Sequence, residues 1–343
     1  MEEALNHSTR FATLSAAALL AASSLTPAAA QDAQDYLLAT ASTGGTYYPV
    51  GVALATLVKV RLQPTDGIGI SAINSAGSGE NIALLRDDEA QFAILQGLYG
   101  AYARNGTGPI ASEGPQDNAC SISMLWQNVE HFVIDAEHVD TGTVSDIAAL
   151  SGEAAALGAQ NSGTLGSNTV LLENLGTPVE EFELVYGGYG PAAEALQNGQ
   201  VEMISTPAGV PVSAITSAFA NMGDGIALLG FTEEQIREAN GEFEDLWTAY
   251  DIPAGTYPGQ TEDVTTIAQP NFLAVRCDLP EETIYKITST MFENLPFLQS
   301  IHPATNAMSL DAALPGLPLP LHPGAQRYFE EQGLEIPERL VKG

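Results

Sequence analysis

The sequence predicts an α/β protein built from two similar halves. Between residues 36 and 95, apolar runs typical of strands are each followed by a break of Ser, Thr and Gly and then by apolar residues at helical spacing. The same order recurs between residues 154 and 205. Alternating strands and helices are typical of parallel α/β units, and 343 residues suffice for two lobes with separate cores.

The elements of the first half follow one another closely. Strands are predicted over residues 36–41, 68–73 and 92–95, where short apolar runs end at small or polar residues. Helices are predicted over residues 50–62, with Pro49 in the first turn, and over residues 80–88.

The second half repeats this arrangement. Strands are predicted over residues 154–159, 182–186 and 201–205. Helices are predicted over residues 167–175, which Gly176 terminates, and over residues 191–196.

Two later segments differ from this pattern. Residues 232–259 are polar, with Pro253 and Pro258 near the end, which indicates surface structure. Residues 315–323 are dense in proline and predict irregular or polyproline-like chain, ahead of a final helix over residues 325–331.

The composition excludes several classes of protein and partner. The chain carries 42 acidic and 11 basic residues, a net charge of −31, with no basic run. Nucleic acids and anionic membranes are polyanions, so we expect neither as a partner. A hydrophobic fraction of 45% excludes a disordered acidic tail. Two cysteines exclude a disulfide-dense scaffold and a multi-cysteine zinc or iron–sulfur site.

The N-terminus has the features of a signal peptide. Arg10 precedes an apolar run over residues 11–25, and residues 28–30 offer an A-x-A cleavage site before Gln31. We therefore expect a signal peptide over residues 1–30 and a periplasmic mature protein, although the run also fits an Ala-rich helix of the mature fold. Residues 1–30 hold two acids and one base, which leaves −30. An oxidising compartment permits a disulfide between the two cysteines without requiring one.

Three turns share one design. Residues 42–48, 75–81 and 161–166 each join a predicted strand to a helix through Ser, Thr and Gly. Free N–H groups and the positive dipole end of a helix bind anions, and glycine lets a ligand approach the backbone. Ser and Thr are also ordinary helix caps, so one such turn is a weak signal. In open parallel sheets such turns meet at the carboxyl ends of the strands, so three of them predict a shared ligand cleft.

Motifs for nucleotides and catalysis are missing from the sequence. The glycine turns match neither G-x-G-x-x-G nor a P-loop, and Gln160 to Gly163 lacks the first glycine of a nucleophile elbow. The five histidines form no H-E-x-x-H motif. We therefore expect no catalytic residues, no cofactor and no metal site. Aromatic residues accompany the turns and fit either the walls of a cleft or core packing, Tyr47, Tyr48, Tyr186, Tyr189, Tyr257 and Trp126 among them.

At these residues the chain resembles the TAXI family, the solute receptors of tripartite ATP-independent periplasmic (TRAP) transporters. The resemblance spans nearly the whole mature chain in the family's order. It rests on Ser42-Thr43-Gly44-Gly45-Thr46-Tyr47-Tyr48-Pro49-Val50-Gly51, on Ser78 to Ile82 running to Ala93 to Gln96, on Ile252 to Gln260, and on Pro320 to Ala325.

The resemblance implies a two-lobed, type II-like periplasmic binding protein in which each lobe is a mixed sheet flanked by helices. Two hinge crossings are expected near residues 131–135 and 266–275. Lobe one is then residues 31–133 plus 268–343, with the proline-rich tail folded back on it, and lobe two is residues 134–267.

The function implied is that of a receptor, not an enzyme. It captures a small organic solute, often a carboxylate such as glutamate or a 2-oxo acid, and delivers it to an ion-gradient-driven permease without ATP hydrolysis. We expect a monomer. An exported α/β hydrolase or transferase remains an alternative, as does a signalling receptor.

The expected ligand-binding residues come from the turns and from the family motifs. None of the ten basic residues of the mature chain lies in the three glycine turns, so an acidic ligand group is expected to bind to N–H groups and hydroxyls. The set is Thr43, Gly44, Gly45, Thr46, Tyr47, Tyr48, Ser78, Asn81, Gln96, Ser162, Gly163, Thr164 and Tyr257.

Overall fold

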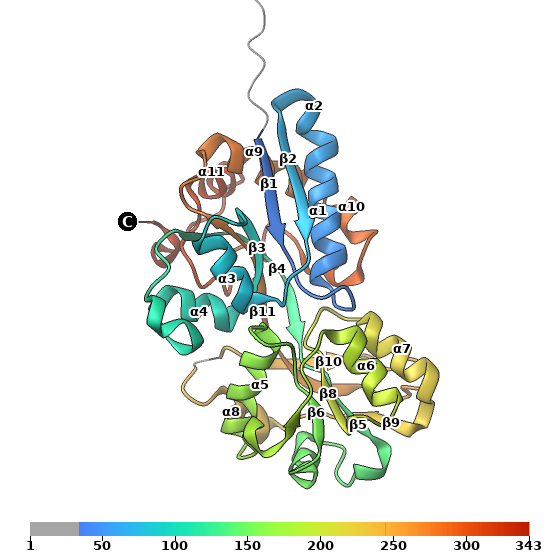
Figure 1. Ribbon diagram of the computed structural model, residues 1–343. Coiled ribbons are helices and arrows are strands. Elements are labelled where there is room, and N and C mark those ends of the chain that lie inside the picture. The colour runs from blue at the N-terminus through green and yellow to red at the C-terminus, as the bar shows by residue number, and fades with distance from the viewer. Residues whose placement is uncertain (1–33, 244, 343) are drawn as a thin grey trace, which may run out of the picture. The chain divides into compact units, whose positions relative to one another are not determined.

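A computed structural model describes residues 34–243 and 245–342 (Figure 1). The expected signal peptide, residues 1–30, lies outside the described residues. Ala33–Gly343 form one compact unit. Within the described residues, every helix is too short or too polar to span a bilayer.

Two mixed sheets organise this unit. In the first, the strands lie in the order β10-β11-β3-β1-β2, and β4 pairs with the other edge of β11. It consists of β1 (Gln34–Ala39), β2 (Ile68–Ile73), β3 (Phe92–Gln96), β4 (Ala119–Val129), β10 (Thr248–Ile252) and β11 (Val264–Arg276). The second has the order β7-β6-β8-β5-β9. It consists of β5 (Phe132–Asp135), β6 (Ala154–Ala156), β7 (Glu183–Leu184), β8 (Met203–Ser205) and β9 (Ile226–Leu228).

Helices cover both faces of each sheet, as Figure 1 shows. In the order β2-β1-β3, the crossover through α1 runs one way along the sheet and the crossover through α3 runs back. Right-handed crossovers therefore place these helices on opposite faces, and the same holds for α5 and α6 in the second sheet. The helices are α1 (Tyr47–Arg61), α2 (Gln63–Asp66), α3 (Ser78–Arg86), α4 (Gly97–Asn105), α5 (Gly163–Asn174), α6 (Tyr189–Gln197), α7 (Ser213–Met222), α8 (Glu233–Asn240), α9 (Glu281–Glu293), α10 (Leu295–Gln299) and α11 (Pro323–Glu331).

The predicted α/β class and the alternation in both halves are confirmed. Helix α5 begins at Gly163 and not at Ser167, because the Ser162 hydroxyl caps it by accepting a hydrogen bond from the Leu165 N–H at 3.0 Å. Helix α6 begins at Tyr189, two residues before the predicted start. The glycine turns therefore supply the first N–H groups of these helices.

The reading of residues 232–259 as surface structure was incomplete. Thr232 and Gln235 form a reciprocal capping box that starts α8. Strand β10 then pairs with β11 in this segment, and the Trp247 side chain is buried just before it. This strand forms because it pairs with β11, and the local composition of residues 232–259 does not reveal that pairing.

The chain passes from the first sheet to the second between β4 and β5, and it returns between β9 and β10. Strand β4 belongs to the first sheet and β5 to the second, so one crossing falls at Glu130 and His131. Strand β11 changes partner on one edge, from β10 at residues 264–268 to β3 at residues 271–275. The Glu130 N–H donates to the Ile267 carbonyl at 2.8 Å, so the two segments touch. We keep the lobe limits 31–133 plus 268–343 and 134–267 as a proposal.

The proline-rich tail lies along β4. The Ser121 N–H donates to the Pro320 carbonyl at 2.7 Å, and the His322 N–H donates to the Ser121 carbonyl at 2.9 Å. Beside this contact, a disulfide joins Cys120 to Cys277 across a Cα–Cα distance of 5.2 Å. The end of β11 is therefore tied covalently to β4.

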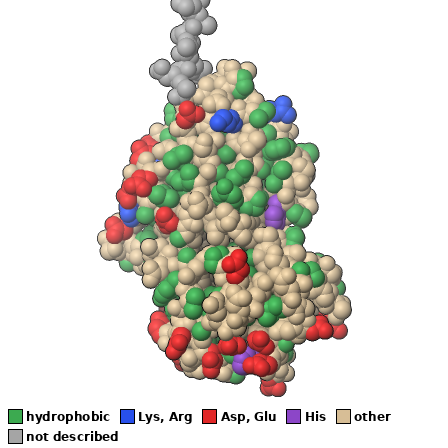
Figure 2. Space-filling model, turned by 45° about the vertical axis from the view of Figure 1, so that its right-hand side comes forward, with side chains coloured by type: hydrophobic (Ala, Val, Ile, Leu, Met, Phe, Trp, Pro, Cys, Tyr) green, Lys and Arg blue, Asp and Glu red, His purple; other side chains and the backbone are tan. Residues whose placement is uncertain are grey.

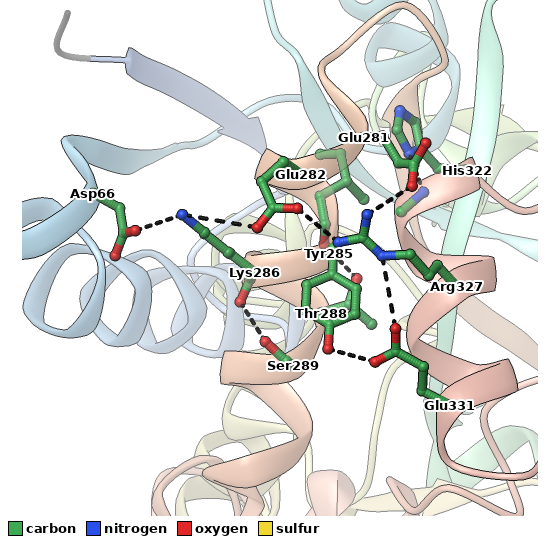
Figure 3. Close-up of polar contacts among 12 residues, drawn as sticks. Asp66, Glu281, Glu282, Tyr285, Lys286, Thr288, Ser289, His322, Arg327 and Glu331 are labelled. Carbon is green, nitrogen blue, oxygen red and sulfur yellow. Dashed lines mark hydrogen bonds and ion pairs between the residues drawn. The ribbon is translucent and has the colours of Figure 1, made fainter. Parts of the chain in front are cut away.

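An ionic cluster fixes α11 against α9 (Figure 3). The Arg327 guanidinium lies 2.8 Å from Glu281 and 2.7 Å from Glu282, and its central carbon is 4.0 Å from the centre of the Tyr285 ring. The Tyr285 hydroxyl donates to Glu331 at 2.6 Å. These groups lie at the surface, so we assign the cluster a structural role.

Candidate functional site

A cavity of about 270 Å³ lies between the two halves of the fold. Its walls come from the N-terminal turns of α1 and α3 on one side and of α5 and α6 on the other. Each of these turns follows a strand, so the cavity lies where ligands bind in open α/β sheets. All three glycine turns that the sequence singled out contribute to its lining.

On the side of the first sheet, the hydroxyls are held by backbone groups. Thr46, buried at the start of α1, donates its hydroxyl to the Gly209 carbonyl at 2.8 Å. Ser78, the first residue of α3, accepts a hydrogen bond from the Gln96 N–H at 3.1 Å. The Tyr47 hydroxyl donates to the Asn271 side chain, and burial raises the pKa of this phenol well above its usual range. These contacts fix the side chains on this wall.

On the side of the second sheet, a tyrosine spans two turns. The Tyr189 hydroxyl donates to the Pro207 carbonyl at 2.6 Å and accepts from the Thr164 hydroxyl at 2.8 Å. Its ring approaches Gly45, where an added Cβ would be 3.0 Å from two ring carbons. A side chain at position 45 would therefore press on this ring.

The cavity owes its electrostatics to backbone groups. Among the described residues that line it, none is Asp, Glu, Lys, Arg or His. Four helix N-termini meet there, and each carries unpaired N–H groups and a partial positive charge of roughly half an elementary charge. The arrangement therefore favours an anionic group or strong hydrogen-bond acceptors.

The two halves contact each other around the cavity. The Gln96 side-chain amide donates to the Gly163 carbonyl at 2.8 Å and to the Ser167 hydroxyl at 2.5 Å. The Glu80 N–H donates to the Asn161 carbonyl at 3.0 Å. These bonds join α3 and β3 to the turn before α5, which closes the cavity on this side.

Most of the predicted ligand-binding residues line the cavity. They are Thr43, Gly45, Thr46, Tyr47, Ser78, Gln96, Ser162, Gly163 and Thr164.

Four predicted residues lie outside the lining, Gly44, Tyr48, Asn81 and Tyr257. Asn81 is fully buried, and its amide donates to the Thr40 and Ile94 carbonyls at 2.8 and 2.9 Å. The Tyr257 hydroxyl accepts from the Val212 N–H at 3.1 Å, and its ring is buried. In both residues the polar atoms are used within the fold.

The predicted ligand-binding set left out several residues of the lining, including Tyr189, which the sequence marked only as a residue of the cleft wall or of the core. Tyr189 and Gly188 belong to a fourth strand–glycine–helix turn, whose design matches the other three, so the same signal identifies them. Asn128 projects from β4, and Ala208 follows β8. For these two, no local pattern marks the position.

One group of potential metal ligands occurs among the described residues, away from the cavity. His138 Nε2 lies 3.3 Å from Glu202 and 3.6 Å from Glu137. Figure 2 shows acidic side chains gathered at the lower end of one face, over the second half of the fold. Pairing of an imidazole with carboxylates on an acidic surface accounts for the group, so we assign no metal to it.

The chain is similar in sequence to one protein family and in fold to several solved structures. Residues 38–333 match the model of a family described as NMT1-like. PhnD1 from Prochlorococcus marinus (MIT 9301), solved with methylphosphonate, has a TM-score of 0.51 and 11% identity, over 80% of this chain and 91% of that chain. The periplasmic binding protein BugD has a TM-score of 0.50 and 13% identity, over 87% of this chain and 93% of that chain. A protein from Bordetella bronchiseptica RB50 has a TM-score of 0.50 and 12% identity, over 88% of this chain and 83% of that chain. At these identities the likeness shows the fold, that of two-lobed periplasmic binding proteins.

Proposed function

The chain belongs to the NMT1-like family, and from the cavity between its halves we propose that it is a solute receptor of the periplasm. It binds one small organic anion, a carboxylate, and it acts as a monomer without catalysing a reaction. The two lobes close around the solute by a hinge motion where the end of β4 contacts β11.

The observation that carries the proposal is the meeting of four helix N-termini in a cavity whose described lining holds no charged side chain. A carboxylate entering this cavity exchanges water for N–H and hydroxyl donors, and each hydrogen bond to a charged group contributes roughly 1.5–3 kcal/mol. The donors come from Thr43, Gly45, Thr46, Tyr47 and Ser78 on one lobe and from Ser162 to Thr164 on the other.

A carboxylate is preferred over other anions because of the resemblance to the TAXI family in the stretch Ser42 to Gly51, part of which lines the cavity. Methylphosphonate, the molecule solved with PhnD1, is the natural competitor. A thermal-shift screen with glutamate, 2-oxoglutarate, pyruvate and methylphosphonate tests the class, since tight ligands raise the melting temperature. A shift with methylphosphonate alone contradicts a carboxylate solute, and no shift with any of them contradicts the proposed function.

Calorimetry on variants then tests the site. In the structure the Thr46 hydroxyl donates to the Gly209 carbonyl and the Thr164 hydroxyl to Tyr189, and we propose that both hydroxyls turn to the solute when it binds. Thr46→Ala and Thr164→Ala are then expected to weaken binding on the order of tenfold, because about 1.4 kcal/mol corresponds to a factor of ten. Arg86→Ala and Arg104→Ala serve as controls, since neither arginine lines the cavity. Loss of binding in an arginine variant, with near-wild-type affinity in both threonine variants, contradicts this assignment.

The partner proposed for the receptor is a TRAP permease, again on the resemblance. Solute uptake by cells that produce receptor and permease is then abolished by ionophores that dissipate ion gradients. Uptake that survives the ionophores and stops on ATP depletion indicates an ATP-driven transporter.

A further inference from the structure

A buried carboxyl lies at the crossing between the two sheets. Glu130 has 0% of its surface exposed, and neither of its carboxyl oxygens has a hydrogen-bond partner among the described residues. Buried carboxylates are normally paired, and an unpaired buried charge is strongly unfavourable. The position of Glu130 therefore calls for a functional explanation.

Glu130 lies behind the wall of the cavity. Its N–H donates to the Ile267 carbonyl at 2.8 Å and so continues the pairing of β4 with β11. Side chains alternate along extended chain, so Glu130 points to the same side as Asn128, which lines the cavity. Tyr189, another lining residue, is close enough for the Glu130 charge to raise the pKa of its phenol, although burial is the larger cause.

The residues beside Glu130 do not neutralise it. His131 Nδ1 donates to the Val129 carbonyl at 2.8 Å, so Nε2 accepts from the Tyr257 hydroxyl at 2.7 Å. Burial lowers the pKa of this imidazole to about 4, so it is neutral at pH 7. From β11, Thr266 donates its hydroxyl to the Glu130 carbonyl at 2.9 Å, and from α6, Tyr189 presents a neutral phenol.

We propose that the protein takes up one proton together with its solute, and that Glu130 is the proton-binding group. The inference rests on the proposed function, because closure of the lobes around a solute is what buries the carboxyl. In the open protein the crossing meets water and Glu130 is ionised. On closure, a proton from solvent adds to a carboxylate oxygen and gives the neutral acid, and on opening it returns to solvent.

The size of the effect follows from the two protonation equilibria. Burial raises the pKa of Glu130 from its ordinary value of 4.5 to about 8 in the closed protein. At pH 7 the open form then holds almost no proton there and the closed form about 0.9 of one, so binding takes up close to one proton. The affinity for the solute falls as pH rises from about 5 toward 8 and then levels off. The total loss of affinity between pH 6 and pH 9 is about 100-fold.

Isothermal titration with 2-oxoglutarate tests this inference, because both carboxyls of this probe stay ionised between pH 6 and pH 9. At pH 7 the titration is run in three buffers with different enthalpies of ionisation, and the slope of the observed enthalpy counts the protons. We expect about 0.9 proton for the wild type and close to zero for Glu130→Gln, whose affinity no longer depends on pH. Asp146→Asn is the control, since this buried carboxylate accepts N–H bonds from Thr141 and Gly142 and lies away from the cavity.

Two results overturn the inference. One is 2-oxoglutarate binding by the wild type with the same enthalpy in all three buffers, and the other is proton uptake that persists in Glu130→Gln. Both leave the proposed function intact, whereas failure of every anion in the thermal-shift screen removes the proposed function itself. The wild-type buffer series decides the question even if the variant does not fold.

Discussion

Replacing Gln96 by alanine should weaken solute binding without weakening the fold. Gln96 ends β3, and its side-chain amide reaches across to the Gly163 carbonyl at 2.8 Å and the Ser167 hydroxyl at 2.5 Å. Both acceptors belong to α5 in the other half, so under the proposed hinge motion these bonds form only when the lobes are closed. In the open receptor, water replaces them.

The magnitude follows from two neutral hydrogen bonds. Each contributes about 1 kcal/mol net, so Gln96→Ala destabilises the closed form by about 2 kcal/mol relative to the open one. Because solute binding draws on the closed form, Kd should rise about 30-fold, by a similar factor for every solute that is bound. The melting temperature of the solute-free protein should change little.

Gln260→Ala is the matched control for this experiment. Its amide also donates to two carbonyls, those of Ile252 and Glu262 at 3.2 and 3.0 Å, but both belong to its own segment. Calorimetry and thermal melts on both variants separate the roles. The reasoning is refuted if Gln96→Ala leaves Kd unchanged and lowers the melting temperature by the amount expected for a loss of about 2 kcal/mol of stability. Gln96 would then stabilise the fold without taking part in closure.

One further variant tests closure, and reduction of the disulfide tests stability. Gly163→Ala introduces a Cβ that would lie 2.7 Å from the Gln96 side-chain oxygen and 2.9 Å from the Ser78 Cβ, so closure must displace these groups. We expect at least roughly tenfold weaker binding by calorimetry. Wild-type affinity would show that the halves close without this approach. Cys120 and Cys277 are separated by 157 residues, so their disulfide restricts a long loop of the unfolded chain. Reduction should lower the free energy of unfolding by about 2–5 kcal/mol, and identical urea midpoints with and without reductant would contradict this.

Local chemistry explains how much of the site was predictable. The turns at residues 42–48, 75–81 and 161–166 were identifiable because a strand, a run of Ser, Thr and Gly and a helix start are adjacent in the chain. Their place at the carboxyl ends of strands follows from the parallel α/β pattern. All three turns contribute to one cavity, as the pattern predicts.

The direction of individual side chains was not predictable in the same way. Asn81 and Tyr257 sit in segments that looked like ligand contacts, yet each points into the fold and bonds to groups far away in the sequence. A polar side chain next to a cleft turns toward whichever unpaired donor or acceptor the packed core leaves for it. Those partners come from other strands, so a single segment does not contain the information.

The sequence by itself determined the alternation of strands and helices and the glycine turns. It also showed that the two cysteines could form a disulfide in an oxidising compartment. The tertiary structure decided that β10 joins the first sheet, that Cys120 and Cys277 meet, and that Asn128 and Tyr189 share a cavity with the turns. It also decided that Glu130, which no sequence pattern marks, is buried without a hydrogen-bond partner for its carboxyl group among the described residues. Local patterns depend on residues a few positions apart, whereas strand pairing and burial depend on contacts between distant segments, and only the folded chain brings these together.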